Sequence, residues 1–242
     1  MKKPIIGIIS QNSVNNEGRS FLSKTNFSID IKNSISESNG IPIGLLLPLN
    51  ERDFNDLPFD GYVFQGGTAI NVEQIMAMHY AIKSDKPILG ICMGMQTMAL
   101  YSYMYDVFNG KIGYDESKKF LESLKNVYFF KKVTGHDNCN PFYIQRINES
   151  LHKVNLDNNS RLSNIYGESV MMPSVHNYAV RDEYMGSMFQ ITGRCDDGVI
   201  EVIEGNNFDA LGVQFHPEVC KDKRIFEDYI KRVRVKRRSE YY

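Results

Sequence analysis

A cysteine stands between two glycines in the segment 90–94, which has the sequence GICMG. The apolar run 87–91 is typical of a buried strand, and residues 93–100 favour a helix. Cys92 is therefore predicted to lie at a sharp strand-to-helix turn, a nucleophile elbow, where a strained backbone presents the side chain. The positive end of the helix would favour the thiolate, and the Met93 amide would face a developing oxyanion. An inert cysteine is the alternative, because free cysteines often pack as small apolar side chains.

A candidate base follows a second predicted strand near the end of the sequence. The apolar run 210–215 leads directly into His216, Pro217 and Glu218. Pro217 cannot continue a strand ladder, so it is expected to end the strand. His216 can take the thiol proton and return it to a leaving group, while Glu218 can orient the imidazole and stabilise its charged form. Alone, these three residues would suit a polar turn; with Cys92 they predict a Cys–His–Glu triad.

A pair of glycines follows the predicted strand 61–64. Gly66 and Gly67 carry no side chain that would keep a ligand away from the backbone amides. With the Gly67 amide opposite that of Met93, an oxyanion hole would be complete. The alternative for this glycine pair is an ordinary turn.

Two segments of the chain resemble a known family. Residues 87–96 (PILGICMGMQ) and 212–218 (GVQFHPE) resemble, in the same order, the two signature blocks of class I glutamine amidotransferase-like hydrolases. Weaker blocks resemble the γ-glutamyl-γ-aminobutyrate hydrolase-like branch, and they lie at residues 4–8, 40–48, 59–67, 152–154 and 174–176. The resemblance extends over most of the chain and implies a cysteine-dependent hydrolase with no cofactor and no metal ion.

The resemblance also assigns roles to individual residues. It implies catalytic roles for Cys92, His216 and Glu218, with the amides of Gly67 and Met93 as the oxyanion hole. The implied substrate contacts are Gly66, Gln96, Ser174 and His176. For Gln96 a packing or capping role is the alternative, and for His176 a structural one.

Three positions depart from the hydrolase branch. The branch usually has an aspartate two residues after its glycine pair, where this chain has Ala69, and an arginine after the nucleophile, where it has Met93. The typical Asn-Ser-x-His-His-Gln stretch is here 173–178, PSVHNY. These are recognition positions, so γ-glutamyl-γ-aminobutyrate is not expected to be the substrate, and the amine half stays open.

Strand and helix signals alternate through the first half of the chain. We expect a helix over 24–39 that ends at Gly40, a helix over 72–84, the elbow helix, and strands at 42–47, 61–64 and 87–91. This rhythm predicts one α/β domain, residues 1–242, with a mostly parallel central sheet and helices on both faces. The second half is less regular and is expected to form a small β-rich extension, with a hairpin over 196–204 that turns at Asp197 and Gly198. Ligands in such sheets bind at the carboxyl ends of the strands, where Cys92 falls.

Composition excludes several classes of function. A net charge of −1 gives no pull toward nucleic acid or a membrane surface, and no run is long enough to span a bilayer. The four cysteines lack paired spacing, which argues against disulfides and a structural zinc site and favours a cytoplasmic location; they are Cys92, Cys139, Cys195 and Cys220. His136 and His152 are expected to be loop residues without a role. The basic run 231–238 is expected to be a solvated helix end rather than a binding site for nucleic acid or an acidic partner.

The predicted function is hydrolysis of a small-molecule γ-glutamyl amide, which releases glutamate and an amine through a glutamyl thioester. Two other functions remain open. The chain could be a glutaminase subunit that delivers ammonia to a synthase partner, or a binding module with a silent site. The oligomeric state is also open, with a homodimer among the options.

Overall fold

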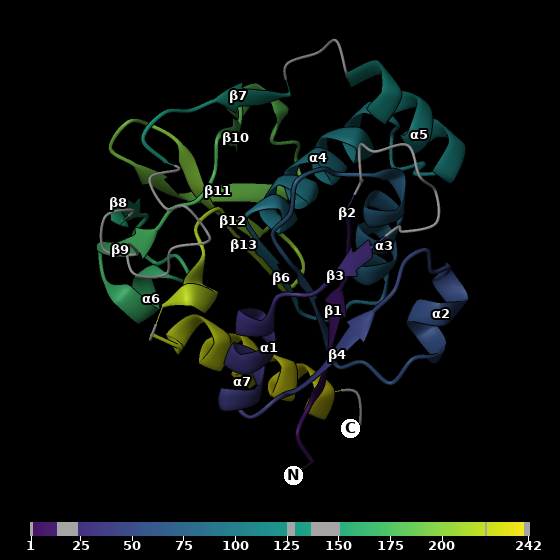
Figure 1. The fold of residues 1–242 in the computed structure, drawn as a ribbon, viewed down its shortest axis with the longest axis horizontal. Coiled ribbons are helices and arrows are strands. Elements are labelled where there is room, and N and C mark those ends of the chain that lie inside the picture. The colour runs from purple at the N-terminus through teal and green to yellow at the C-terminus, as the bar shows by residue number, and fades with distance from the viewer. Residues whose placement is uncertain (1, 14–23, 125–128, 137–150, 221, 240–242) are drawn as a thin grey trace.

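The computed structural model describes residues 2–13, 24–124, 129–136, 151–220 and 222–239. These residues build a central sheet with the strand order β4-β1-β5-β6-β13-β12-β11-β8-β9 (Figure 1). In that order the strands are β4 (Ile41–Leu45), β1 (Ile5–Ile9), β5 (Gly61–Phe64), β6 (Ile88–Ile91), β13 (Ala210–Val213), β12 (Ile200–Gly205), β11 (Phe189–Cys195), β8 (Leu151–Leu156) and β9 (Ser169–Pro173). The strands from β4 to β13 pair in parallel, whereas the pairings from β13 to β9 are antiparallel. The expected β-rich extension therefore continues the parallel sheet.

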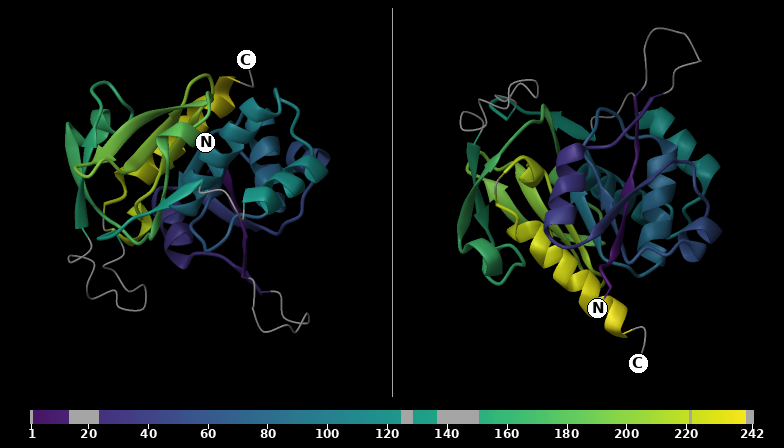
Figure 2. Two further views of the ribbon diagram at one scale, coloured as in Figure 1. Left: turned by 90° about the horizontal axis from the view of Figure 1, so that it is seen from above. Right: turned by 60° about the horizontal axis from the view of Figure 1, so that its bottom comes forward.

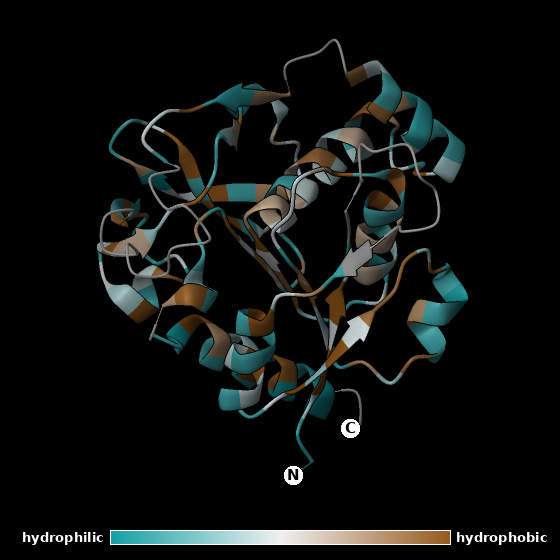
Figure 3. Ribbon diagram, in the orientation of Figure 1, coloured by the Kyte–Doolittle hydropathy of each residue, from teal (hydrophilic) through white to brown (hydrophobic). Residues whose placement is uncertain are grey.

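Helices cover both faces of this sheet, as predicted. On one face α1 (Ile29–Glu37) packs beside α7 (Arg224–Ser239), and both bury apolar side chains in one core cluster (Figure 2). On the other face α3 (Val72–Lys83) and α4 (Met93–Val107) contribute to a second cluster. The central strands are largely hydrophobic, while the outer helices α2 (Glu51–Asp56) and α5 (Tyr114–Ser123) show hydrophilic residues (Figure 3).

Short elements complete the described chain. Two small ribbons lie outside the central sheet: β2 (Gln11–Ser13) pairs with β3 (Lys24–Asn26), and β7 (Phe130–Lys132) pairs with β10 (Tyr178–Val180). The remaining helical segments are α6 (Ser163–Tyr166) and the 3-10 turns η3 (Asp182–Tyr184) and η4 (Pro217–Val219). Among the described residues, no helix has the length and apolarity that a membrane crossing requires.

Several boundaries differ from the sequence prediction. The helix expected from residue 24 begins only at Ile29, because Ser28 caps it by accepting a hydrogen bond from the Ile31 amide at 3.3 Å. The residues before it pair as strand β3 instead. Asn39, not Gly40, takes the left-handed conformation after this helix, with φ of 71°. The last parallel strand stops at Val213, so Pro217 begins η4 rather than ending the strand.

Other predicted elements are confirmed. The helix expected over 72–84 and the strands expected at 61–64 and 87–91 lie within one residue of their predicted bounds. The predicted hairpin is formed by β11 and β12, and Gly198 adopts a φ of 82° in the turn between them.

The basic run lies within α7 and is largely paired inside the chain. Lys236 contacts Asp85 at 2.5 Å, and Arg237 contacts Asp60 at 3.4 Å. Arg232 pairs with both Asp209 and Asp228. The run is therefore a helix end, as expected, but these three residues also pair with carboxylates of the same chain and are not simply solvated.

Candidate active site

Cys92 lies at the turn between β6 and α4. Its φ of 52° and ψ of −109° place a residue with a side chain in a strained part of backbone space. Hydrogen bonds hold it there, since its amide donates to the Val213 carbonyl at 2.7 Å and its carbonyl accepts from the Gln96 amide at 3.1 Å. The backbone therefore has the geometry that the elbow prediction requires, at the carboxyl edge of the parallel strands.

Two glycines make this turn sterically feasible. A Cβ on Gly94 would run into the carbonyl of Phe64 on β5. A Cβ on Gly90 would lie 2.7 Å from Met98 Sδ and 2.9 Å from the Gly94 carbonyl carbon. The predicted close approach of strand and helix is thus confirmed, and it depends on both positions lacking a side chain.

His216 and Glu218 form a close pair beside the thiol. Glu218 Oε1 accepts a hydrogen bond from His216 Nδ1 at 2.7 Å, which leaves Nε2 free to serve another group. A Cβ placed on Gly66 would lie 3.1 Å from His216 Cε1 and 3.9 Å from Cys92 Sγ, so imidazole and thiol both border this glycine. Burial disfavours the imidazolium, but the charges of Glu218 and Cys92 outweigh it and raise the pKa of His216 well above its ordinary value.

The two predicted oxyanion donors border one space. Met93 is the first residue of α4, so its amide has no partner within the helix. A Cβ on Gly67 would lie 2.9 Å from Met93 Cε, and it would also strike the amide end of Gln11. Gln11, which no sequence motif marks, donates to the Gln65 carbonyl at 3.3 Å and so reaches the site from the start of β2.

A pocket of about 600 Å³ opens beside Cys92. Its lining contains the thiol, both predicted oxyanion residues and two of the predicted substrate contacts. The lining residues are Gly67, Thr68, Ala69, Ile70, Cys92, Met93, Gln96, Leu100, Leu121, Leu124, Phe129, Phe130, Val175, His176, Asn177 and Tyr178. The walls farther along α4, α5 and β7 are apolar.

The remaining predicted contacts divide into two groups. Gln96 and His176 line the pocket, whereas Ser174 does not; its buried hydroxyl donates to the His136 carbonyl at 2.8 Å. Gln96 Nε2 donates both to the Tyr178 carbonyl at 2.9 Å and to Gln214 Oε1 at 3.1 Å. The capping role considered for Gln96 is thus replaced by a link between two chain segments.

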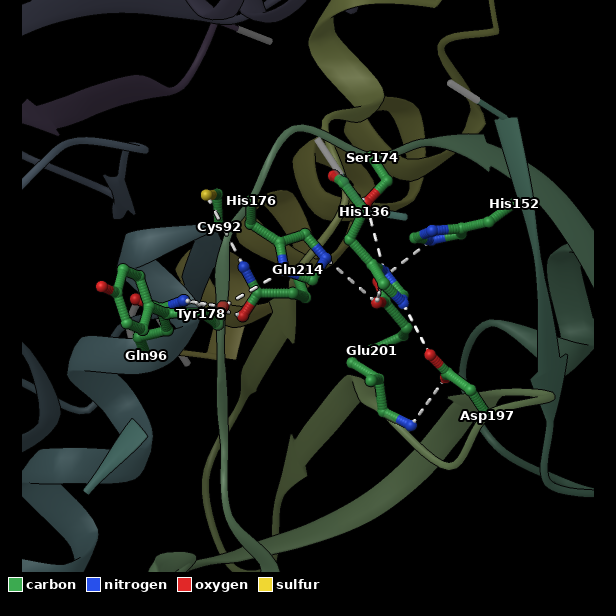
Figure 4. A network of polar contacts seen from close by, with 11 residues as sticks. Cys92, Gln96, His136, His152, Ser174, His176, Tyr178, Asp197, Glu201 and Gln214 are labelled. Carbon is green, nitrogen blue, oxygen red and sulfur yellow. Dashed lines mark hydrogen bonds and ion pairs between the residues drawn. The ribbon is translucent and has the colours of Figure 1, made fainter. Parts of the chain in front are cut away.

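Sequence reasoning missed Gln214. This fully buried side chain directs Nε2 toward Cys92 Sγ at 3.6 Å while its Oε1 accepts from Gln96 (Figure 4). Two signals could have found it: Gln214 lies within the block 212–218 that resembles the family, and it is a polar residue between apolar ones, two positions before His216.

His136 lies in a loop, as expected, but His152 does not, and both side chains have polar partners. His152 belongs to β8, and both side chains gather with His176 around the buried carboxylate of Glu201 (Figure 4). With Cys195 they form a group whose side-chain atoms are close enough to share a metal ion. Within the described chain Cys92, Cys195 and Cys220 are free, and Cys139 lies outside it.

Known proteins resemble this chain over most of its length. The chain is 26% identical to a glutamine amidotransferase-like protein of Rickettsia prowazekii (strain Madrid E), over 93% of this chain and 94% of that protein. It is 25% identical to the glutamine-hydrolysing GMP synthase of Dictyostelium discoideum, over 82% of this chain but 24% of that protein. A crystal structure from Thermoplasma acidophilum, described as that of a GMP synthase subunit, superposes with a TM-score of 0.65 at 15% identity and covers 99% of this chain and 98% of that one.

The family model of Peptidase C26 matches residues 71–218, which is more than half of the chain and includes Cys92, His216 and Glu218. The α/β fold agrees with that of glutamine amidotransferase-like neighbours. This protein therefore belongs to the Peptidase C26 family of glutamine amidotransferase-like hydrolases.

Proposed function

We propose that the chain hydrolyses γ-glutamyl amides with Cys92 as nucleophile, His216 as acid and base, and Glu218 as the residue that orients His216. The observation that carries this proposal is the strained cysteine beside the 2.7 Å His216–Glu218 pair, at the wall of a pocket that also contains Gly67 and Met93. A nucleophile, a base and an orienting carboxylate in this relation support acyl transfer.

The first half of the reaction forms a thioester. The Cys92 thiolate attacks the γ-carbonyl carbon, and the oxyanion that develops would accept hydrogen bonds from the Gly67 and Met93 amides. The C–N bond then breaks as His216 gives its proton to the departing nitrogen. The amine leaves and the glutamyl group stays on sulfur.

The second half returns the enzyme to its starting state. His216, now neutral, takes a proton from water while the water oxygen attacks the thioester carbonyl. The C–S bond breaks, glutamate leaves, and the thiolate and the imidazolium are restored as a pair. The raised pKa of His216 supports this cycle, because a protonated imidazole can then give its proton to the departing nitrogen.

The pocket supports an amine half larger than ammonia. Its volume of about 600 Å³ lies in the range of small-molecule sites. Beyond the thiol its walls include Leu100, Leu121, Leu124 and Phe130, which can bury apolar surface that ammonia does not have. The substrate class that fits best is therefore a γ-glutamyl amide of an apolar amine.

Mass spectrometry on a panel of γ-glutamyl amides tests this function. The panel should span charged, aliphatic and aromatic amines and include free glutamine, with glutamate and amine release both measured. We expect release from the apolar members, and a glutamyl adduct on Cys92 after rapid quenching. Cys92→Ala should abolish both signals, while Cys220→Ser should keep the adduct. Normal turnover by Cys92→Ala would refute the mechanism.

The alternative is a glutaminase that supplies ammonia to a synthase. Its support is the similarity to the Dictyostelium GMP synthase, of which this chain spans 24%. Under this alternative the panel would release ammonia from glutamine alone, and the rate would rise when the synthase partner is added.

A further inference from the structure

A second polar cluster lies next to the pocket, in the antiparallel half of the sheet. Its centre is Glu201 on β12, whose side chain is fully buried. Three imidazoles face this carboxylate: His136 Nδ1 at 3.6 Å and His176 Nε2 at 3.2 Å from Oε1, and His152 Nε2 at 3.3 Å from Oε2 (Figure 4). The Cys195 thiol at the end of β11 completes the group. The proposed hydrolase mechanism uses none of these contacts.

His136 and His176 each contact a hydrogen-bond acceptor with the ring nitrogen that faces away from Glu201. His136 Nε2 lies 2.9 Å from Asp197 Oδ2, and His176 Nδ1 lies 3.1 Å from the Tyr178 carbonyl, which can only accept. A neutral imidazole has one N–H, so in a neutral His136 or His176 with that proton on the far side, the nitrogen that faces Glu201 carries a lone pair. Lone pairs that point at a buried carboxylate are unfavourable unless positive charge lies between them.

The other side of Glu201 shows the same lack of donors. Neither nitrogen of His152 has a hydrogen-bond partner among the described residues, and neither has Glu201 Oε2, although the two groups are 3.3 Å apart. They are close but not aligned as donor and acceptor. The neighbouring Ser174 hydroxyl does not supply a donor, because it gives its proton to the His136 carbonyl.

We propose that His136, His152, Cys195 and Glu201 bind one zinc ion. The charge would balance, since a thiolate and a carboxylate together neutralise a divalent cation, and the thiol proton would pass to solvent on binding. Two imidazoles, one thiolate and one carboxylate form a mixed set of N, S and O ligands that suits zinc better than calcium or magnesium, which prefer oxygen.

The distances fit a tetrahedral site. Four ligands at zinc bond lengths lie about 3.4 Å from one another. One atom from each proposed ligand already lies within 4.8 Å of the other three, and the His–Glu contacts of 3.3 and 3.6 Å match that spacing. A small inward movement of the thiol and the imidazoles would close the site.

The hydrogen bonds around the proposed ligands also resemble those that hold metal ligands in place in other proteins. A ligating histidine usually donates its other N–H to a carboxylate or a carbonyl, and Asp197 serves His136 in this way. The ion would join β8, β11 and β12 to the segment after β7.

His176 lies between this site and the pocket. On one side it contacts Glu201, and on the other it contacts the Tyr178 carbonyl, which also accepts a hydrogen bond from Gln96. The expectation of no structural zinc site was drawn from cysteine spacing, and that spacing does not reveal ligands from four separate segments.

Metal analysis of the full, untagged chain tests the proposal. Purified without chelator, it should carry about one zinc per chain. After chelator treatment, titration with Co²⁺ should produce a thiolate-to-cobalt charge-transfer band and the strong visible bands of a tetrahedral ion, and added zinc should remove both. Cys195→Ser should lose the charge-transfer band, whereas Cys220→Ser should keep it.

A second variant protects the test against misfolding. Asp197 is half exposed in a turn, so Asp197→Asn should fold and still weaken Co²⁺ binding about 10- to 100-fold. A wild-type chain that shows no charge-transfer band would overturn the proposal, and protonated histidines would then balance Glu201. Equal Co²⁺ affinity in wild type and Cys195→Ser would overturn it as well. Hydrolase activity enters neither outcome, so the two proposals fail separately.

Discussion

The pKa of His216 is raised even though burial by itself would lower it. The charges of Glu218 and Cys92 more than offset that effect and raise the pKa of the imidazole well above its ordinary value. A raised pKa favours the imidazolium form of His216, and an imidazolium favours a thiolate beside it. In the proposed mechanism Glu218 therefore keeps the proton on His216 until the leaving group takes it.

Glu218→Gln should therefore shift the pH profile of the enzyme. The active ion pair is lost as pH rises through the pKa of His216, and removing the carboxylate lowers that pKa. The alkaline limb of kcat/KM should move to lower pH, and kcat should fall about 100-fold because proton transfer is less well supported. Initial rates across the pH range measure both effects. The exposed Glu183→Gln is the control, and an unmoved alkaline limb in Glu218→Gln would contradict the assignment.

In the proposed mechanism we expect Gln214 to act as a positioning residue for the sulfur of Cys92. Its amide directs a proton toward Cys92 Sγ at 3.6 Å, and hydrogen bonds to charged groups are worth about 1.5–3 kcal/mol. Gln214→Met keeps the volume but removes this donor, so kcat/KM should fall about tenfold and iodoacetamide should alkylate Cys92 with an altered pH dependence. Labelling rates followed by mass spectrometry provide the measurement.

Gln74 provides a matched control for that experiment. It is a buried glutamine too, but its side chain accepts from the Asn71 amide at 3.1 Å and caps α3. Gln74→Met should lower the free energy of unfolding by about 1 kcal/mol and leave the alkylation profile of Cys92 unchanged. Identical alkylation profiles in Gln214→Met and wild type would remove Gln214 from the site.

At the scale of elements, the sequence predicts best where a local rule decides the backbone. The elbow around Cys92 and the turn at Gly198 follow from glycines at fixed positions in apolar segments. Strand β3 could not be predicted in this way, because Lys24–Asn26 has no apolar alternation. Its described pairing is with β2. Tertiary pairing overrides helix propensity there.

The polar cluster escaped prediction for a related reason. His136, His152, Cys195 and Glu201 come from separate segments, and only the pairing of β8, β11 and β12 brings them together. The residues next to each of them in the sequence form no metal-binding motif. Register across an antiparallel sheet, which local patterns do not specify, determines that their side chains meet.

The elbow itself can be tested through Gly94. A methyl group there would overlap the Phe64 carbonyl on β5, so α4 would have to move away from the sheet. We expect Gly94→Ala to lower the free energy of unfolding by about 1–3 kcal/mol, measured with urea, and to reduce kcat more than KM because the thiol is displaced. Gly113→Ala is the matched control, since the Cβ would meet only the mobile end of Glu116. Equal effects of the two substitutions would argue against a crowded elbow.

At the scale of the whole molecule, the parallel and antiparallel halves of the sheet contribute different residues to the candidate site. The parallel half places Cys92 and Gly67 at its carboxyl edge, and β13 carries the chain toward His216 at the same edge. The later half adds β7 and β10, which bring Phe130 and Tyr178 to the pocket wall. Bond cleavage is thus assigned to one half, and the shape available to the amine depends on both.

Phe130→Ser separates the hydrolase from the glutaminase at this scale. If the pocket holds an apolar amine, loss of the ring should raise KM for such γ-glutamyl amides about tenfold, because burial of a large apolar side chain is worth about 1.5–3 kcal/mol. KM for glutamine should change little, since ammonia would not reach that wall. Phe208→Ser is the control: this residue precedes β13 and packs on Phe189, away from the pocket lining. An equal rise in KM for both substrate types would mean that Phe130 does not contact the amine, and it would shift the assignment toward the glutaminase.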